Sequence, residues 1–346
     1  MGDFTYILQK ISDHSDLESD EAAYALQKIV TGKVNPSHTA AFLFGMTSKG
    51  ATVEELTAFV HVMREAAVTV EVDTESAIDL CGTGGDKTGT FNISTAAMFV
   101  TAGAHVPVLK HGNAGVSSKS GSSDVLKHLG VHPQLPKDKI ETCFRETGMA
   151  FMFAPIFHPA MAHVMPVRKE LGMRTFFNIM GPMLNPAGVK RQMIGAFNLE
   201  TANSIIRILR NLGTEFAYAV HSEDGLDEFS TTAPTHVYQL MDQNVENSRI
   251  VHSGVFGLTQ STMQDLRGGT PEVNAEIIRA ILDDKSTRAQ REIVLLNAAF
   301  AIHTSGIYDD IQEAYYAAEE SLETGNAREA LKRLADCTSQ LQNAPS

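Results

Sequence analysis

The sequence has no excess of basic residues and no long apolar run. Its 346 residues hold 28 lysines and arginines against 41 aspartates and glutamates, a formal net charge of −13. Non-specific nucleic-acid binding depends on a basic surface that displaces counterions from phosphates. No stretch approaches the length of about 18 apolar residues that indicates a membrane helix, and the N-terminus lacks the pattern of a secretory signal. We therefore expect no nucleic-acid partner and no membrane association.

Cysteine is scarce and tryptophan is absent. The three cysteines, Cys81, Cys143 and Cys337, are odd in number and widely spaced, without a Cys-x-x-Cys pair. This spacing argues against a disulfide framework and fits a reducing compartment, so the expected location is cytoplasmic. The lack of tryptophan decides nothing by itself. With 43% hydrophobic and 20% charged residues, the chain has an ordinary globular composition and is long enough for two domains.

In the first seventy residues the sequence predicts helices only. These helices cover residues 20–30, 35–46 and 52–67. The second has the cap and first-turn proline of Asn35-Pro36, and the third opens with a capping-box pattern. From residue 77 short apolar runs alternate with helical stretches, which predicts a parallel sheet with crossover helices. The predicted strands cover 77–81, 106–109, 192–197, 217–221 and 235–240. The predicted later helices cover 94–102, 122–129, 272–282, 287–303, 311–322 and 327–341.

The most informative motif is a glycine-rich turn, Gly82-Thr83-Gly84-Gly85-Asp86, after a predicted strand. Glycine reaches positive φ without a steric penalty, and successive exposed amides in such a turn form a concave anion site. Asn92-Ile93-Ser94-Thr95 then opens a helical run whose unpaired amides suit a second phosphate. Two anion sites so close together imply a ligand with more than one phosphate. A glycine-rich turn alone often binds nothing, and only its strand–turn–helix context strengthens this interpretation.

Other polar residues follow the next predicted strand, as Lys110-His111-Gly112-Asn113. Ligand sites in open α/β sheets lie beyond the carboxyl ends of the strands. Lys110 can place a point charge on a phosphate, while His111 and Asn113 can hydrogen-bond a small planar substrate. A surface lysine and a structural histidine are the alternatives. The serine-rich stretch 117–123 can add hydroxyl groups or form a plain capped turn.

Two further sites carry charge. Asp227-Glu228 offers the carboxylates that Mg²⁺ prefers beside substrate phosphates, although an acidic pair is commonly only solvated. Arg168 lies on a helix that we also expect to carry His158. Its planar guanidinium can clamp a carboxylate; the alternative is a solvated helix charge.

Together, six motifs make the sequence resemble the anthranilate phosphoribosyltransferase family from about residue 18 to residue 336. They are Gly82–Asp86, Asn92–Thr95, Lys110–Asn113, Ser117–Ser122, Phe176–Pro186 and Gly225–Glu228. The resemblance implies an α/β fold with a small all-helical domain, residues 1–72, joined by helices from about 155–185. The larger α/β domain, residues 73–346, would hold a central, mostly parallel sheet with flanking helices. It also implies a homodimer.

The resemblance implies that the 5-phosphoribosyl group of 5-phosphoribosyl diphosphate (PRPP) is transferred to the amine of anthranilate. The products would be N-(5-phosphoribosyl)anthranilate and diphosphate, in L-tryptophan biosynthesis, with Mg²⁺ as two ions per subunit. Because an aryl amine is unprotonated at neutral pH, no covalent nucleophile or essential general base is required. Two departures from the family are Ala114-Gly115, where an arginine is frequent, and Met161, where an aromatic residue is frequent. Neither removes a group that the chemistry requires.

Residue roles carried over from the family fall into three sets. PRPP would contact Gly82, Thr83, Gly84, Gly85, Asp86, Thr90, Asn92, Ile93, Ser94, Thr95, Lys110, Ser118 and Ser122. Anthranilate would contact Gly82, His111, Asn113, Pro155, His158 and Arg168. Magnesium would be held by Ser94, Asp227 and Glu228.

Two alternatives share the expected architecture. A pyrimidine nucleoside phosphorylase also uses a glycine-rich phosphate loop, but needs neither Arg168 with Asn113 on a carboxylate nor the metal pair at Asp227. A non-catalytic, nucleic-acid-binding relative would keep the fold. The charge of −13 and the complete set of site residues argue against it.

Overall fold

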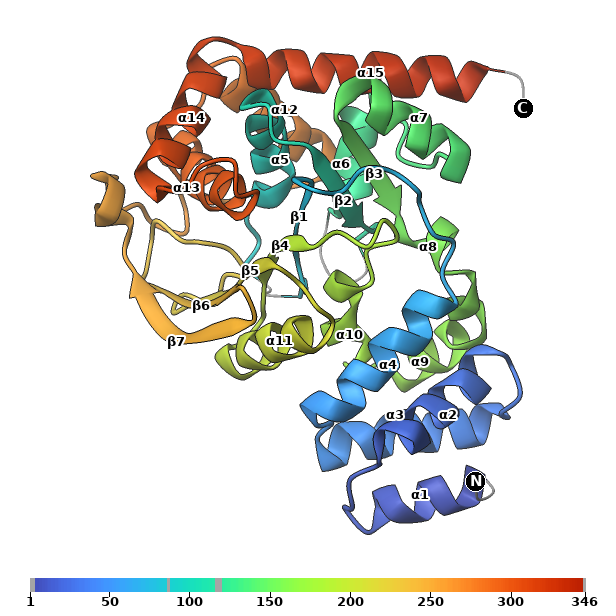
Figure 1. Ribbon diagram of the computed structural model, residues 1–346. Helices are drawn as coiled ribbons and strands as arrows, with labels where there is room; N and C mark the ends of the chain where they lie inside the picture. Colours follow the sequence, from blue (N-terminus) through green and yellow to red (C-terminus); the bar gives the residue numbers. More distant parts are fainter. Residues whose placement is uncertain (1–3, 86–87, 116–119, 345–346) are drawn as a thin grey trace.

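The computed structural model describes residues 4–85, 88–115 and 120–344 (Figure 1). A bundle of short N-terminal helices lies against a larger unit in which helices cover a central sheet. This is the α/β fold with a small helical part and a mostly parallel sheet that the sequence predicts. No helix within the described ranges has the length and apolarity needed to cross a membrane.

The N-terminal bundle contains α1 (Phe4–Ser12), α2 (Ser19–Val30), α3 (Pro36–Lys49) and α4 (Val53–Glu65). The predicted caps are present. The Asn35 side chain accepts a hydrogen bond from the His38 amide, and α4 begins with a capping box. The prediction missed α1, although its buried residues recur at helical spacing.

The sheet has seven strands in the order β3-β2-β1-β4-β5-β6-β7, with β1 to β5 parallel and the last two antiparallel. Their bounds are β1 Ile78–Gly82, β2 Val108–Gly112, β3 Met149–Phe153, β4 Arg191–Gly195, β5 Phe216–Ser222, β6 Thr235–Met241 and β7 Asn244–Val251. The sequence analysis did not predict β3 or β7. β3 is a short apolar run without alternation, and β7 is largely exposed and polar at the sheet edge.

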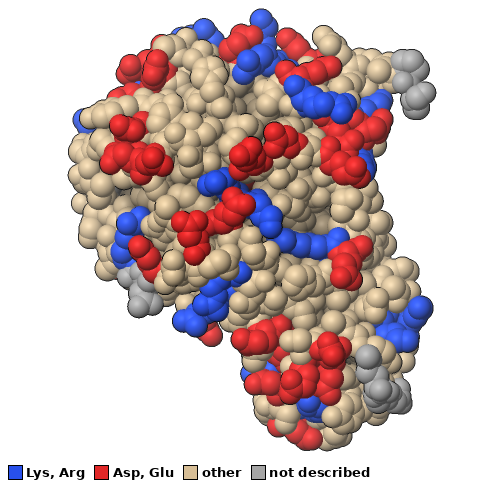
Figure 2. Space-filling view, viewed as in Figure 1, with Lys and Arg blue, Asp and Glu red and all other residues tan. Residues whose placement is uncertain are grey.

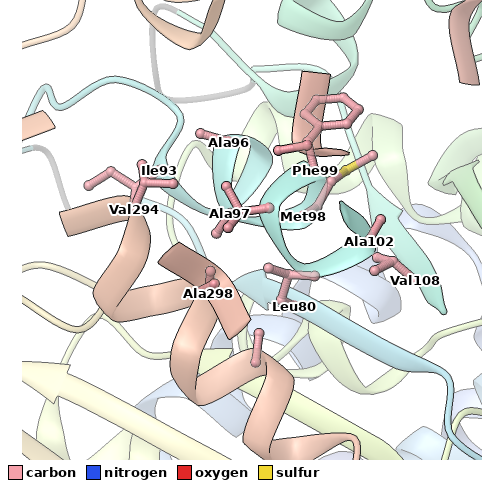
Figure 3. Close-up of a cluster of buried hydrophobic side chains, with 14 of the residues drawn as sticks. Leu80, Ile93, Ala96, Ala97, Met98, Phe99, Ala102, Val108, Val294 and Ala298 are labelled. Atoms are coloured by element: carbon pink, nitrogen blue, oxygen red, sulfur yellow. The ribbon is translucent and has the colours of Figure 1, made fainter. Parts of the chain in front are cut away.

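Helices cover both faces of the sheet. On one face α5 (Ile93–Gly103) is buried at every position except Ser94 and packs against α13 (Arg288–Thr304). Figure 3 shows Ala97 of α5 facing Ala298 of α13 above Leu80 of β1, so small side chains bring these elements close together. The same layer includes α6 Ser122–His128, α7 Lys137–Thr147, α12 Pro271–Leu282, α14 Ile311–Glu323 and α15 Asn326–Asn343.

The opposite face packs against α11 (Leu199–Asn211) and forms one hydrophobic cluster with the N-terminal bundle. The segment 154–184 contributes α8 Ala154–Phe157, the 3₁₀ turn η1 Pro159–His163, α9 Met165–Leu171, α10 Phe177–Met180 and the 3₁₀ turn η2 Gly181–Met183. The expectation that His158 and Arg168 share one helix is wrong. A proline stands in the first turn of each of α8, η1 and α9, where it starts a helix and cannot continue the preceding one.

Candidate active site

The carboxyl ends of β1 and β4 form the point where the strand order reverses. From β1 the chain moves outward to β2 and β3, and β4 then pairs with the other side of β1. In open α/β sheets ligands bind outside the carboxyl ends of the strands at such a reversal. β1 and β4 end here in two glycines in register, Gly82 and Gly195.

The two glycines make room for Asp227, which follows β5. A Cβ at Gly195 would overlap the main-chain carbonyl of Asp227, and a Cβ at Gly82 would overlap its carboxylate. The Asp227 carboxylate accepts a hydrogen bond from the Gly84 amide at 2.9 Å. Asp227 is thus held directly against the glycine-rich turn.

Glu228 connects the same acidic pair to the second predicted phosphate segment. Its Oε1 accepts a hydrogen bond from the Ser94 amide, 3.1 Å away, in the first turn of α5. The pair is therefore linked to both anion segments rather than being an ordinary solvated pair.

The donor set at this position fits Mg²⁺. Two carboxylates and the Ser94 hydroxyl are hard oxygen donors, and Mg²⁺ is commonly held by one or two carboxylates together with substrate phosphates. The described part of the chain brings together no group of three or more His, Cys, Asp and Glu side chains suited to a metal ion. A metal at Asp227 and Glu228 would take its remaining ligands from water or from substrate phosphates, as Mg²⁺ commonly does.

The glycine-rich turn is fixed by its neighbours. Gly84 and Gly85 have φ values of +67° and +76°, which favour glycine. The Thr83 amide donates to the Gly195 carbonyl at 2.8 Å, and the Thr83 hydroxyl accepts from the Phe197 amide at 3.1 Å. Asp86, predicted to bind PRPP, lies outside the described residues, as does Ser118.

Arg174 also contacts this turn, and the sequence analysis missed it. Its guanidinium donates to the Gly85 carbonyl and lies 4.4 Å from the centre of the Phe197 ring. A single arginine in a loop carries no motif, so only the fold could place it here.

Asn92 joins the start of α5 to two other segments. Its Oδ1 accepts from Asn274 Nδ2 at 2.8 Å and from the Ser120 hydroxyl at 3.2 Å, while its Nδ2 donates to the Ser120 carbonyl. Asn274, at the beginning of α12, was not predicted. The side chains of Ile93 and Thr95 are buried, so these two residues can offer a ligand only their main chain.

Thr90 and Ser122 flank this segment. Thr90 forms an isolated antiparallel bridge with Arg267, and the Ser122 hydroxyl donates to the Asn113 carbonyl at 3.2 Å. Asn113 and Pro155 are both exposed. Pro155 begins α8 just beyond β3, whose last residue pairs with the end of β2.

Lys110 and His111 project to opposite faces of the sheet, as successive strand residues do. Lys110 is only 2% exposed, which rules out a surface lysine. Its ammonium donates to the Leu80 carbonyl and lies 3.4 Å from the Ser94 hydroxyl. A positive charge is therefore buried under the first turn of α5.

His111 lies on the other face against His158, with ring centres 5.1 Å apart. Burial lowers the pKa of His111 to about 3 and that of His158 to about 4, so both rings are neutral near pH 7. His111 Nε2 and both ring nitrogens of His158 are buried and make no hydrogen bond of normal geometry to any described residue. Such atoms suit a polar ligand.

Arg168 is half-buried on α9. Its Nη2 donates to the Asn178 side chain at 3.3 Å, and its guanidinium lies 5.2 Å from the centre of the Phe177 ring. No acidic side chain within the described ranges forms an ion pair with it. Because a half-buried, unpaired guanidinium is unlike a solvated helix charge, Arg168 suits a ligand carboxylate.

The charges on the molecular surface show no broad basic area in the view of Figure 2. Lysine and arginine are interspersed with aspartate and glutamate on this face. This face therefore gives no support to a nucleic-acid interface.

Two family models match the chain. Residues 74–328 match the glycosyl transferase family, a/b domain, and residues 5–67 match the glycosyl transferase family, helical bundle domain. An anthranilate phosphoribosyltransferase from Salinibacter ruber is 47% identical over 340 residues, covering 97% of this chain and 99% of that protein. The chain belongs to the anthranilate phosphoribosyltransferase family. The relative from Xanthobacter autotrophicus is 43% identical, covering 99% of this chain and 98% of that protein.

Solved structures of the family have the same fold. The anthranilate phosphoribosyltransferase of Thermus thermophilus superposes with a TM-score of 0.90 at 34% identity, covering 96% of this chain and 99% of that one. The enzyme from Saccharomyces cerevisiae, in complex with PRPP and Mg, gives 0.89 at 25% identity, covering 97% and 98%. The family resemblance drawn from six motifs is therefore confirmed.

The contact between Gly195 and Asp227 leads to a prediction. Gly195→Ala should displace the loop that carries Asp227 and Glu228, because the new Cβ would overlap the Asp227 main chain. We expect a loss of Mg²⁺-dependent PRPP binding of about tenfold or more, corresponding to roughly 1.4 kcal/mol, measured by titration calorimetry. Gly254→Ala is the control, since its Cβ would meet no atom within 4 Å. If a folded Gly195→Ala protein bound PRPP with native affinity, this result would contradict a close contact between Gly195 and Asp227 on which PRPP binding depends.

Proposed function

We propose that this protein transfers the 5-phosphoribosyl group of PRPP to the amine of anthranilate and releases diphosphate, a step of L-tryptophan biosynthesis. One observation carries the proposal. The adjacent carboxylates of Asp227 and Glu228 accept hydrogen bonds from the glycine-rich turn and from the start of α5, which are the two segments suited to phosphates. The named relatives support the same reaction. The nucleoside phosphorylase alternative would leave Arg168 and the acidic pair without a role.

PRPP would lie over the carboxyl ends of β1 and β4. The turn Gly82–Asp86 and the segment Asn92–Thr95 would bind its diphosphate and its ribose phosphate, with Thr90, Ser118 and Ser122 beside them. The buried ammonium of Lys110 adds positive charge beneath the first turn of α5. Preorganised donors of this kind stabilise charge that develops on a leaving group.

Mg²⁺ would be held by Ser94, Asp227 and Glu228, as two ions. The Saccharomyces cerevisiae relative is named as a complex with PRPP and Mg. When bound, the metal neutralises negative charge on the phosphates. Asp227 and Glu228 would fix the position of the metal, because both carboxylates are hydrogen-bonded to the two segments proposed to bind phosphate.

Anthranilate would lie on the side of His111 and His158. Arg168 would clamp its carboxylate, and Asn113, Pro155 and Gly82 would complete the pocket. The neutral histidine rings offer hydrogen-bonding atoms without adding charge. Since the aryl amine is unprotonated at neutral pH, the protein needs to hold it in line with the anomeric carbon rather than to supply a base.

We also infer the division of the chain near residue 72, a homodimer and a cytoplasmic location. Two large side chains of the N-terminal bundle, Tyr6 and Phe44, are 50% and 56% exposed on helices that pack together. Exposed apolar side chains of this size are suited to a contact between subunits.

The proposed reaction is tested by the fluorescence of anthranilate. We expect it to fall only when PRPP and Mg²⁺ are both present, and to stay constant after chelation by EDTA. Asp227→Asn with Glu228→Gln should lower kcat/KM by about 100-fold or more at limiting Mg²⁺, because the diphosphate loses its organised counter-charge.

Asp283→Asn with Asp284→Asn removes the same charge from a partly exposed acidic pair after α12, which forms ion pairs with Arg328 and Arg291, and should leave the rate unchanged. A native protein that leaves anthranilate unconsumed would refute the function. Near-native turnover of the Asp227/Glu228 variant at low Mg²⁺ would refute the metal site alone.

Arg168 should determine the preference for anthranilate over aniline, which lacks the carboxylate. A hydrogen bond to a charged group contributes roughly 1.5–3 kcal/mol, so Arg168→Ala should lower kcat/KM for anthranilate about 10- to 150-fold. The value for aniline should change little, and Arg168→Lys should recover little because a point charge cannot replace the planar fork.

Steady-state kinetics with both amines measure this difference. Lys169→Ala, which removes the exposed neighbouring charge, is the control. An unchanged kcat/KM for anthranilate in Arg168→Ala would mean that the carboxylate binds elsewhere.

A further inference from the structure

The pairing of β1 with β2 stops after one register pair. β1 and β4 share five such pairs, as do β2 and β3, but β1 and β2 share only Ile78 with Val108. In a parallel ladder, the Leu80 amide would next donate to the Leu109 carbonyl, and the His111 amide would donate to the Leu80 carbonyl. Three of these groups, the Leu109 carbonyl, the His111 amide and the Leu80 carbonyl, have side-chain partners instead.

Three side chains occupy the place of the missing ladder. The His111 amide donates to Asp79 Oδ1 at 3.1 Å, and the Leu109 carbonyl accepts from Asn185 Nδ2 at 2.8 Å. The Leu80 carbonyl accepts from the Lys110 ammonium. Side chains therefore satisfy main-chain groups that would otherwise bond strand to strand.

Asp79 and Asn185 are also bonded to each other. Asn185 Nδ2 donates to Asp79 Oδ2 at 2.8 Å, and Asn185 Oδ1 accepts from the Ala187 amide at 2.9 Å. Asp79 is fully buried and Asn185 is 3% exposed. Burial raises the pKa of Asp79 to about 6, while the positive charge of Lys110 opposes that rise, so the carboxylate is ionised at neutral pH.

We propose that Asp79 and Asn185 are positioning residues for phosphoribosyl transfer. Their side chains end the pairing of β1 with β2 at the level of the site and fix the end of β2. The Lys110 ammonium is thereby held under the start of α5, and the His111 ring is held against His158 on the other face. One buried pair thus sets the spacing between the two halves of the site.

This arrangement gives a role to the motif Phe176–Pro186, which the proposed function otherwise leaves unused. Asn185 is the residue of that segment that reaches between the strands. A small misplacement of groups that orient reactants can cost on the order of 100-fold in rate. The inference rests on the proposed function, because it concerns the placement of Lys110 and His111 in that reaction.

The test exchanges the two groups. In Asp79→Asn, the new side-chain amide group faces a second donor, which is either the Asn185 side-chain amide or the His111 main-chain amide. In Asn185→Asp, two carboxylates face each other. Each should lower kcat/KM for anthranilate roughly 10- to 100-fold. The double variant Asp79→Asn/Asn185→Asp restores one carboxylate–amide pair, while the Leu109 carbonyl then faces a carboxylate oxygen in place of its donor. It should recover at least about tenfold over the weaker single variant.

Glu55→Gln is the matched control. Glu55 is also a fully buried carboxylate that accepts two main-chain hydrogen bonds, from Leu17 and Thr52, but it lies in the N-terminal bundle. It should lower the melting temperature and leave kcat/KM unchanged. Hydrogen exchange of the peptide that contains the His111 amide should accelerate in Asp79→Asn and not in Glu55→Gln.

The outcomes separate the two proposals. A native protein without activity on anthranilate and PRPP overturns the function, whatever the variants do. An active native protein whose Asp79 and Asn185 variants keep kcat/KM, as Glu55→Gln should, overturns the positioning role. If Asp79→Asn does not fold, Asn185→Ala, which keeps the bond between Asp79 and the His111 amide, gives the same decision.

Discussion

The site depends on the absence of side chains where β1 and β4 end. Asp227 can lie against the glycine-rich turn only because Gly82 and Gly195, which are in register, have no Cβ. From that contact its carboxylate reaches the Gly84 amide, and the next residue, Glu228, reaches the first turn of α5. The sheet topology supplies the open position, since the strand order reverses between these two strands. The acidic pair is thereby placed between two anion-binding segments without a long loop.

The sheet also separates the side chains proposed for the two substrates. Lys110 and His111 are adjacent in β2 and extend to opposite faces, so a buried cation lies under the phosphate segments while a neutral ring lies beside His158. The two histidines and Arg168 differ in charge for a physical reason. Burial lowers the pKa values of both histidines, which keeps positive charge away from them, whereas Arg168 keeps its charge half-buried and without an acidic partner among the described residues. A phosphate ligand and a planar carboxylate would therefore find different partners on the two faces of the sheet.

Much of this could be predicted from the sequence, because it rests on local patterns. The glycine-rich turn, the capped helices and the alternation of strand and helix are each encoded within a few residues. The contacts between distant residues that hold the site together are not encoded in such local patterns. Asn274 meets Asn92 from 182 positions away, and Asn185 meets Asp79 from 106 positions away. An asparagine has many roles, so nothing in its neighbourhood predicted these contacts. The single helix expected through His158 and Arg168 was wrong because two prolines between them, Pro159 and Pro166, each begin a new helical segment.

PRPP and its metal would lie between the glycine-rich turn, the start of α5 and the acidic pair. A crystal structure of the protein grown with Mg²⁺ and PRPP tests this placement most directly. We expect the diphosphate beside the glycine-rich turn, with Mg²⁺ at about 2.0–2.1 Å from a carboxylate oxygen of Asp227 or Glu228. A diphosphate bound away from the carboxyl ends of β1 and β4, or a metal without either carboxylate as ligand, would contradict it.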